Sequence, residues 1–516
     1  MPLPTSLRRS LVRVLFAAAA TASVASVAPA TWSIVVVNTR TREVAVASAT
    51  CLTNFNLRPR QAVVRVGVGA GASQATIDDN GVNRLYMWNQ MPNGLAPAQM
   101  IQDLATLDPG HQNRQLGIAV LYDAPASFTG ANTLDANPQV FGEAGELRYA
   151  IQGNILAGDA VVANAEAALI ATPGDLSLKV MAAMEAARAT GGDGRCSCNQ
   201  PDPTACGAPP ASFTYSAFTA YITVARLGDV DGTCTIAQGC ANGQYFCNLT
   251  AISGVGGFEP VLRLQSLYTG WRAGLATRAD QVETRVVPFA RRLPADGVTS
   301  TTVEVEVRNI EGAVLEDVRT ALRLTQVAGT AANAVAGEPV VVRPGVFRFP
   351  VTAGTQAGSA RWRLEALHEG ITVRLTELEL AIEPAAELFA GFATVRASAD
   401  TVVPFTLDLG AARAGASYLL LGTASGTVPG VALEGALVPL NSDFVFRSSY
   451  RFANTGRFQN TSATLDAFGR AEARFASTAH LLDLFVGRRF DWCAIVRDVP
   501  GAAPHVTNVA SFDLGP

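Results

Sequence analysis

The stretch Ala28-Pro29-Ala30-Thr31-Trp32-Ser33-Ile34-Val35-Val36-Val37 decides how the chain is interpreted. Its first part has the small-x-small pattern of a signal-peptidase site. Its second part is an apolar run that is typical of a buried β-strand. Cleavage between Ala30 and Thr31 would start that strand with a threonine that carries a free α-amine. A hydroxyl nucleophile with its own amine as base meets the requirement for N-terminal nucleophilic catalysis.

The residues before this stretch support export. Residues 8–13 carry three arginines, and residues 14–27 form an apolar segment that is short and alanine-rich for a membrane span. We therefore predict a signal peptide over residues 1–30 and a secreted or periplasmic protein without an integral membrane domain. An uncleaved N-terminal anchor is the alternative, and the sequence does not separate general secretory export from twin-arginine export.

Composition limits the other classes of function. The 516 residues are 49% hydrophobic and 16% charged, with a net charge of -4, which allows several well-packed domains. No basic stripe with interleaved aromatic residues occurs, so we expect no nucleic-acid partner. Lys179 is the only lysine, which leaves a lysine-assisted mechanism a single candidate.

The periodicity of residues 31–280 predicts an α+β domain. Apolar runs at 32–37 and 44–49 indicate a hairpin of buried strands, and a third strand is expected at 62–68 before a glycine-rich segment. Helical spacing follows at 95–107, 159–171 and 175–189, with Asp175 as the N-cap of the last helix. Further strands are predicted at 115–122, 148–152 and 213–227.

The rest of the chain has the pattern of all-β modules. Residues 302–308 alternate strictly between apolar and polar, and short strands separated by Gly and Pro turns follow. We predict one β-sandwich over residues 281–385 and a second over residues 386–516. The entry Ala295-Asp296-Gly297 into alternating strands resembles bacterial Ig-like modules of the invasin kind.

The cysteines favour an oxidising compartment. Six of the eight crowd a Gly- and Pro-rich loop, residues 196–247, which indicates a disulfide-stapled loop. A zinc site would need paired C-x-x-C motifs or nearby histidines, and the loop has neither. The pairing among these six stays open, and we expect Cys51 and Cys493 to be free, buried thiols. The six candidates are Cys196, Cys198, Cys206, Cys234, Cys240 and Cys247.

The usual catalytic constellations are missing from the sequence. His111 is the only histidine before residue 280, and it follows a helix end, where a solvated cap is the commoner role. The motif Asp229-Val230-Asp231-Gly232 opens like a calcium loop but lacks the later bidentate glutamate. We therefore expect no metal site and no cofactor, which leaves Thr31, whose α-amine would titrate near pH 8.

Six stretches of the first domain point to a family. They are Thr31-Trp32-Ser33-Ile34-Val35, Glu43-Val44-Ala45-Val46-Ala47-Ser48, residues 65–75, Asp108-Pro109-Gly110 with Arg114-Gln115, residues 152–158, and Gly191-Gly192-Asp193 with Arg195. In this order they resemble an uncharacterised bacterial family with the Ntn-hydrolase, or proteasome-subunit-like, fold over residues 31–227. The resemblance implies a four-layer αββα sandwich and hydrolysis of C–N bonds by the N-terminal residue.

The chain departs from proteasome-type members in the helpers of the nucleophile. No acid follows the second strand, no lysine follows the third, and Arg58 or Arg60 could supply only positive charge. Asn154 and Asp193 are our candidates for orienting the amine or binding substrate. Backbone amides of the glycine-rich segment are our candidates for the oxyanion hole and substrate contacts. The residues of that segment are Gly69, Ala70, Gly71 and Ser73.

The sequence thus predicts an exported amidohydrolase that acts on a small amide or peptide-like substrate, with Thr31 as nucleophile. The alternative is a non-catalytic exported scaffold that binds a cell-surface partner through its β-sandwich modules. Assembly into a homo-oligomer is a further expectation to test.

Overall fold

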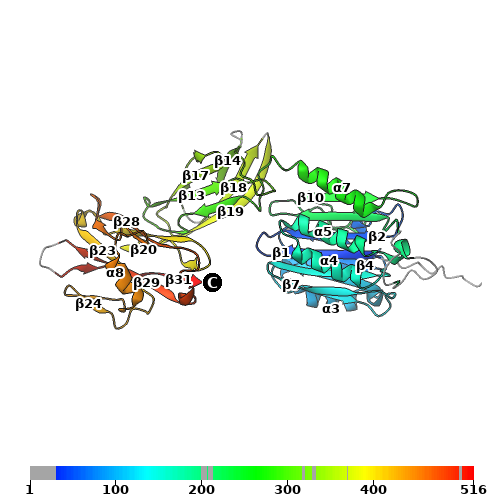
Figure 1. Cartoon of the computed structure of the whole chain (residues 1–516), viewed down its shortest axis with the longest axis horizontal. Helices are drawn as coiled ribbons and strands as arrows, with labels where there is room; N and C mark the ends of the chain where they lie inside the picture. The colour runs from blue at the N-terminus through cyan, green and yellow to red at the C-terminus, as the bar shows by residue number, and fades with distance from the viewer. Residues whose placement is uncertain are drawn as a thin grey trace, which may run out of the picture. The chain divides into compact units, whose positions relative to one another are not determined.

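The chain divides into two compact units, Met1–Gln265 and Ser266–Pro516, in a computed structural model (Figure 1). The structure describes residues 31–198, 206, 213–316, 320–327, 333–368, 370–498 and 503–516. The predicted signal peptide therefore lies outside the described residues. Most regular structure is β-sheet with a few helices, and the domain boundaries expected near residues 280 and 385 stay predictions.

Two sheets form the centre of the first unit. The six-stranded sheet has the spatial order β10 (Cys247–Ile252), β9 (Thr219–Ala225), β2 (Val44–Thr50), β1 (Thr31–Asn38), β8 (Leu147–Asn154) and β7 (Gln139–Ala144). The four-stranded sheet has the order β3 (Ala62–Arg65), β4 (Gly69–Ala75), β5 (Arg114–Val120) and β6 (Ala126–Thr129). β1 lies in the interior of its sheet, between β2 and β8.

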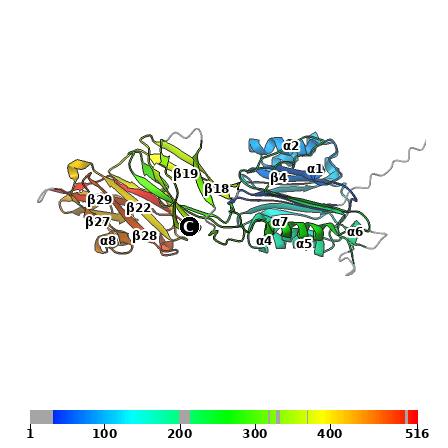
Figure 2. The same ribbon diagram turned by 90° about the horizontal axis from the view of Figure 1, so that it is seen from above.

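Helices cover the outer faces of these two stacked sheets, as Figure 2 shows for α2 on one side and α4 and α5 on the other. Met87, Met100 and Leu104 of α2 and α3 pack on the four-stranded sheet. One hydrophobic core fills the space between the sheets, where Val35 and Val37 meet Ala70 and Ala72. The helices are α1 (Arg58–Gln61), α2 (Val82–Gln90), α3 (Pro97–Leu107), α4 (Ala160–Ala171), α5 (Leu176–Ala189) and α6 (Gly194–Ser197), with 3-10 turns η1 (Met91–Asn93) and η2 (His111–Asn113).

Local sequence explains the main elements. The β1–β2 hairpin forms where it was predicted, and every residue of both strands is buried. Asp175 caps α5, because its side chain accepts hydrogen bonds from the Ser177 and Leu178 amides. The strand predicted at 62–68 ends at Arg65, and the glycine-rich segment after it forms β4. Gly71 allows this close packing, because a Cβ there would lie 2.9 Å from the Met87 sulfur.

The second unit contains two β-sandwich-like cores. One is built around Trp362 and Phe349, and the other around Trp492 and Phe405. The first core's strands are β11 (Arg285–Pro288), β12 (Arg292–Pro294), β13 (Ser300–Glu306), β14 (Ala321–Gln326), β15 (Val335–Ala336), β16 (Val340–Arg343), β17 (Val346–Thr352), β18 (Gly358–His368) and β19 (Ile371–Glu383). Helix α7 (Pro260–Ala273) spans the boundary between the units.

The strands around the last core run from β20 to β31, and helix α8 (Phe444–Arg451) lies between β25 and β26 in the sequence. They are β20 (Leu388–Ala390), β21 (Thr394–Arg396), β22 (Thr401–Asp408), β23 (Ser417–Thr423), β24 (Val431–Leu433), β25 (Ala436–Val438), β26 (Phe458–Gln459), β27 (Ser462–Thr464), β28 (Arg470–Ser477), β29 (Arg489–Arg497), β30 (His505–Val506) and β31 (Ala510–Gly515), with 3-10 turns η3 (Ala411–Arg413) and η4 (Asp483–Phe485). Both sandwiches are built from packed, mainly antiparallel sheets.

Candidate active site

Thr31 lies in a row of polar residues that crosses the six-stranded sheet. It is paired with Thr50 of β2 and with Asn154 of β8, and Thr50 is paired in turn with Thr219 of β9. Residues that pair across strands share a face, and Val35 on that face of β1 packs between the sheets. The Thr31 side chain is therefore directed into the intersheet space, and only 1% of the residue is exposed.

A chain of buried amides reaches Thr31 from the opposite sheet. Gln74 of β4 donates to the Thr31 carbonyl oxygen at 3.0 Å and to Gln115 Oε1 at 3.0 Å. Gln61 of α1 donates to Gln74 Oε1 at 2.8 Å, and the Tyr221 hydroxyl donates to Gln61 Oε1 at 2.9 Å. The strand pattern predicted only apolar packing here, so this network was not expected, although Gln74 and Gln115 stand in largely apolar strands.

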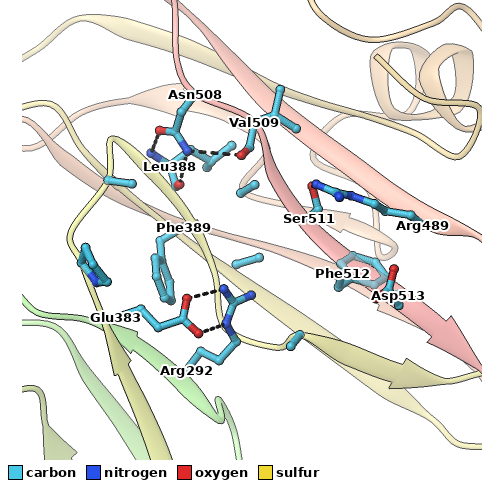
Figure 3. Close-up of a pocket in the computed structure, with 15 residues that line it drawn as sticks. Arg292, Glu383, Leu388, Phe389, Arg489, Asn508, Val509, Ser511, Phe512 and Asp513 are labelled. Carbon is cyan, nitrogen blue, oxygen red and sulfur yellow. Dashed lines mark hydrogen bonds and ion pairs between the residues drawn. The ribbon is translucent and has the colours of Figure 1, made fainter. Parts of the chain in front are cut away.

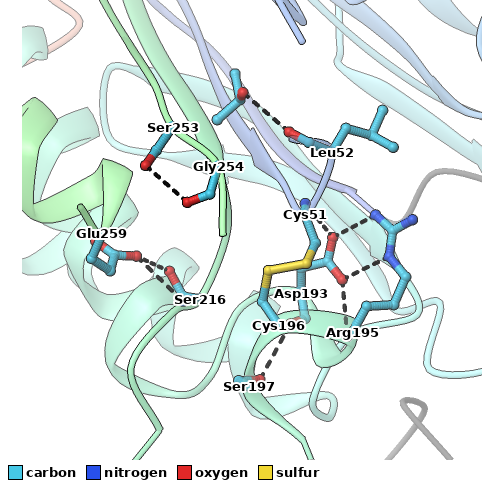
Figure 4. Close-up of a disulfide and its surroundings, with 11 residues drawn as sticks. Cys51, Leu52, Asp193, Arg195, Cys196, Ser197, Ser216, Ser253, Gly254 and Glu259 are labelled. Carbon is cyan, nitrogen blue, oxygen red and sulfur yellow. Dashed lines mark hydrogen bonds and ion pairs between the residues drawn. A yellow bond between two sulfur atoms is a disulfide. The ribbon is translucent and has the colours of Figure 1, made fainter. Parts of the chain in front are cut away.

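Asp193 lies beside the end of β2. Its Oδ2 accepts a hydrogen bond from the Cys51 amide at 2.6 Å and forms an ion pair with Arg195 Nη2 at 2.8 Å (Figure 4). The carboxylate is fully buried. Cys51 directly follows Thr50, the strand partner of Thr31, so Asp193 lies at the same end of the sheet as the first residue of β1.

The neighbouring end of β8 is bound to the same segment. Leu156 bridges to Asp193, and the Gly194 amide donates to the Ile155 carbonyl at 2.9 Å. Ile155 has φ 52°, in the left-handed region that β-branched residues avoid, at a cost of about 1–3 kcal/mol. Strain of this kind, held by surrounding contacts beside Thr31 and Asn154, is typical of functional sites.

Three disulfides form among the described residues, and they correct part of the cysteine prediction. Cys51 pairs with Cys196, so Cys51 is not a free thiol, while Cys247 is free and buried rather than bonded. The other bonds join Cys198 to Cys206 and Cys234 to Cys240, and Cys493 is free and buried as expected. Cys51 was misassigned because its partner is 145 residues away. Disulfides of this number indicate an oxidising, extracytoplasmic environment.

The structure places the glycine-rich segment inside a sheet. Gly69, Ala70 and Gly71 lie in β4, which has β3 on one side and β5 on the other, so their amides face ladder partners. Ser73 alternates with Gln74 and therefore lies on the helix-covered face, away from the intersheet space. The structure thus brings Thr31, Asn154 and Asp193 into one region. The four residues of the glycine-rich segment instead lie within the packed sheet.

The loop between β4 and α2 is held by Arg114, a buried cation to which the sequence pattern assigned no role. Arg114 Nη1 donates to the carbonyl oxygens of Thr76 and Ile77 at 2.7 and 2.9 Å. Its Nε pairs with Asp108 Oδ2 at 2.8 Å. Although burial alone would raise the pKa of Asp108, the bonds from Arg114, Asn83 and Gly110 hold that pKa below its usual value.

Other features offer less for catalysis. The described residues hold no group of His, Cys, Asp and Glu side chains suited to a metal ion, and their helices are too short or too polar to cross a membrane. A pocket in the second unit contains an Arg292–Glu383 ion pair and Asn508, which clamps the Leu388 backbone (Figure 3). Arg292 and Glu383 bind one another, and Arg489 donates to Ser511 Oγ at 2.8 Å, so these polar groups are already engaged.

Comparison with known proteins finds a family match over the part of the chain that begins at Thr31. Residues 31–200 match a family of unknown function, DUF1028. A DUF1028 structure, SPO2555 from Silicibacter pomeroyi, is 19% identical with a TM-score of 0.35, and the alignment covers 49% of this chain and 89% of that chain.

Two adhesin structures also align at low similarity. The Escherichia coli adhesin FdeC is 11% identical with a TM-score of 0.19, covering 78% of this chain and 92% of that chain. Invasin, described as a bacterial integrin-binding protein, is 9% identical with a TM-score of 0.18, covering 94% of this chain and 60% of that chain. No curated protein matches the chain. None of these similarities is high enough to transfer a function.

Proposed function

We propose that the first unit has the Ntn-hydrolase fold and hydrolyses C–N bonds of small amide or peptide-like substrates, with Thr31 as the N-terminal nucleophile after removal of residues 1–30. The observation that carries this proposal is the position of Thr31. It is the first residue of a buried central strand and lies in a row of polar side chains. The stacked sheets with outer helices and the DUF1028 match support the fold assignment.

The chemistry needs only the residue itself and its neighbours. The neutral α-amine accepts the proton of Thr31 Oγ as that oxygen attacks the substrate carbonyl, and it then protonates the departing amine. Water hydrolyses the resulting acyl ester by the same route and restores the hydroxyl. Asn154 orients the amine from β8, and the Asp193 carboxylate favours its placement electrostatically.

The β4–α2 loop supplies oxyanion donors in this proposal. The N–H of a trans peptide points opposite to its C=O. Because the Thr76 and Ile77 carbonyls point at Arg114, the Ile77 and Asp78 amides point away from it. Arg114 belongs to the helix-covered face of β5, and neither amide donates to another residue in the described part of the chain. Two such amides suit a developing oxyanion.

N-terminal sequencing of the exported protein tests the proposal first, and the expected start is Thr31. A mature chain with any other start contradicts it. A hydroxyl-directed electrophile, followed by peptide mass spectrometry, should then label Thr31 in the mature protein. Thr31→Ala should abolish the label, Thr31→Ser should retain it, and Thr39→Ala, in the exposed β1–β2 turn, should leave it unchanged. If the mature chain begins at Thr31 but Thr31 is not labelled, the non-catalytic scaffold is favoured.

A further inference from the structure

A polar cavity of about 550 Å³ opens in the first unit between the segment around the start of α1 and the cysteine loop. None of its lining residues is acidic, and several carry side-chain amides or a guanidinium. They are Asn56, Arg58, Pro59, Thr233, Ala237, Gln238, Ala241 and Asn242. A cavity with this lining offers hydrogen-bond donors and one positive charge.

The cysteine-loop wall of this cavity is a fixed structure. Cys234 and Cys240 are joined by a disulfide, and Thr235 and Gly239 exchange backbone hydrogen bonds inside it. The Val64 amide of β3 donates to the Cys240 carbonyl at 2.9 Å. Gly239 lies against Pro59 so closely that a Cβ would stand 2.4 Å from the Pro59 carbonyl oxygen. The wall is therefore anchored both to the sheet and to α1.

Arg58 is the unusual member of the lining. It is partly buried, yet its guanidinium has no ion-pair or hydrogen-bond partner among the residues that the structure describes. Burial lowers the pKa of the guanidinium, and the Tyr221 and Tyr245 hydroxyl groups oppose that shift only in part. A partly buried guanidinium that has no protein partner is available to bind an anion.

Gln238 offers a second hydrogen-bond donor in the same cavity. Gln238 Oε1 accepts a hydrogen bond from Thr233 Oγ1 at 2.8 Å, which leaves the Gln238 NH₂ group to donate elsewhere.

We propose that this cavity binds a carboxylate, with Arg58 as the charged ligand and the Gln238 amide as a second donor. The planar fork of a guanidinium matches the two oxygens of a carboxylate. The site stands apart from the Thr31 chemistry and does not require Thr31 to be catalytic. It is nevertheless connected to Thr31, because α1 carries both Arg58 and Gln61, the residue that binds Gln74.

Thermal unfolding of the mature full-length protein with succinate tests the site, since a ligand that binds only the folded state raises the melting temperature. Phosphate and chloride at equal ionic strength are the comparison ligands. We expect succinate to raise the melting temperature of the first unit. Arg58→Gln should weaken succinate binding about tenfold or more, because hydrogen bonds to a charged group are lost. Arg60→Gln, on the same helix but outside the lining, should bind like wild type.

Ligand-free stability gives an independent readout. Because Arg58 is unpaired, Arg58→Gln should unfold at a higher temperature than wild type in chloride alone, whereas a structural arginine would make the variant less stable. Gln238→Ala should fold and bind succinate more weakly. Absence of a succinate effect on wild type, an equal effect on Arg58→Gln, or stabilisation by phosphate but not succinate would each overturn the carboxylate assignment.

Discussion

The Cys51–Cys196 disulfide should be the most stabilising of the three in the first unit. In the loop-entropy treatment, stabilisation grows with the logarithm of the number of residues that the bond encloses. The 145-residue separation gives about 5 kcal/mol at 25 °C, whereas the 6-residue separation of Cys234 and Cys240 gives about 2 kcal/mol. The two loops do not overlap, so each bond can be removed without altering the other's span.

Hydrogen exchange followed by mass spectrometry can measure this difference in the two double variants Cys51→Ser/Cys196→Ser and Cys234→Ser/Cys240→Ser. Peptides of β1 and β2 report the opening of the first unit, and peptides of β29 serve as an internal reference for the second. Both variants should exchange faster than wild type in β1 and β2. The loss in opening free energy should be about 3 kcal/mol larger in Cys51→Ser/Cys196→Ser than in Cys234→Ser/Cys240→Ser. Equal exchange in the two variants would refute the entropic argument.

Three further predictions follow from buried groups. Burial raises the pKa of the Cys247 and Cys493 thiols to about 12, so both should resist alkylation at pH 8 in the native protein and react once it is unfolded without reductant; native alkylation of Cys247 would contradict its position. Gly192→Ala should destabilise the first unit by about 2 kcal/mol or more in chemical denaturation, because the residue has φ 56° and a Cβ would lie 2.6 Å from the Trp32 ring. Asp108→Asn should cost about 3 kcal/mol at pH 7, where the buried pair with Arg114 is intact. Since the folded pKa of Asp108 is depressed, its contribution is present above pH 4 and lost as pH falls through the folded pKa, so wild type and variant should converge once pH is below that folded pKa; a constant difference would show that the ion pair is not responsible.

Local patterns in the sequence were sufficient for much of the first unit. The apolar runs around residues 32–37 and 44–49 predicted the β1–β2 hairpin, and Asp175 followed by helical spacing predicted α5. These features depend on neighbours within a few residues, which is why one sequence reveals them. The glycine-rich segment was harder, since Gly69 and Gly71 have weak strand propensity and form β4 only because close tertiary packing requires them.

Long-range contacts account for what the sequence did not predict at the candidate site. Thr31 could be proposed from the cleavage pattern, and Asn154 and Asp193 were named as candidates within the stretches that carry the resemblance. The bond between Cys51 and Cys196, the glutamine chain through Gln74, and the grip of Arg114 on the β4–α2 loop all join segments that are remote in sequence. Such contacts depend on how the sheets stack, which periodicity does not encode.

The span of the Cys51–Cys196 bond also has a mechanical consequence. When a chain is pulled from its ends, residues enclosed by a disulfide cannot extend, and this bond encloses the whole four-stranded sheet together with β7 and β8 of the six-stranded sheet. An extended chain gains about 3.4 Å per residue, so reduction of this one bond would release roughly 500 Å of additional contour length. The intact bond would therefore keep the segment between Cys51 and Cys196 short under load even after its strands had separated.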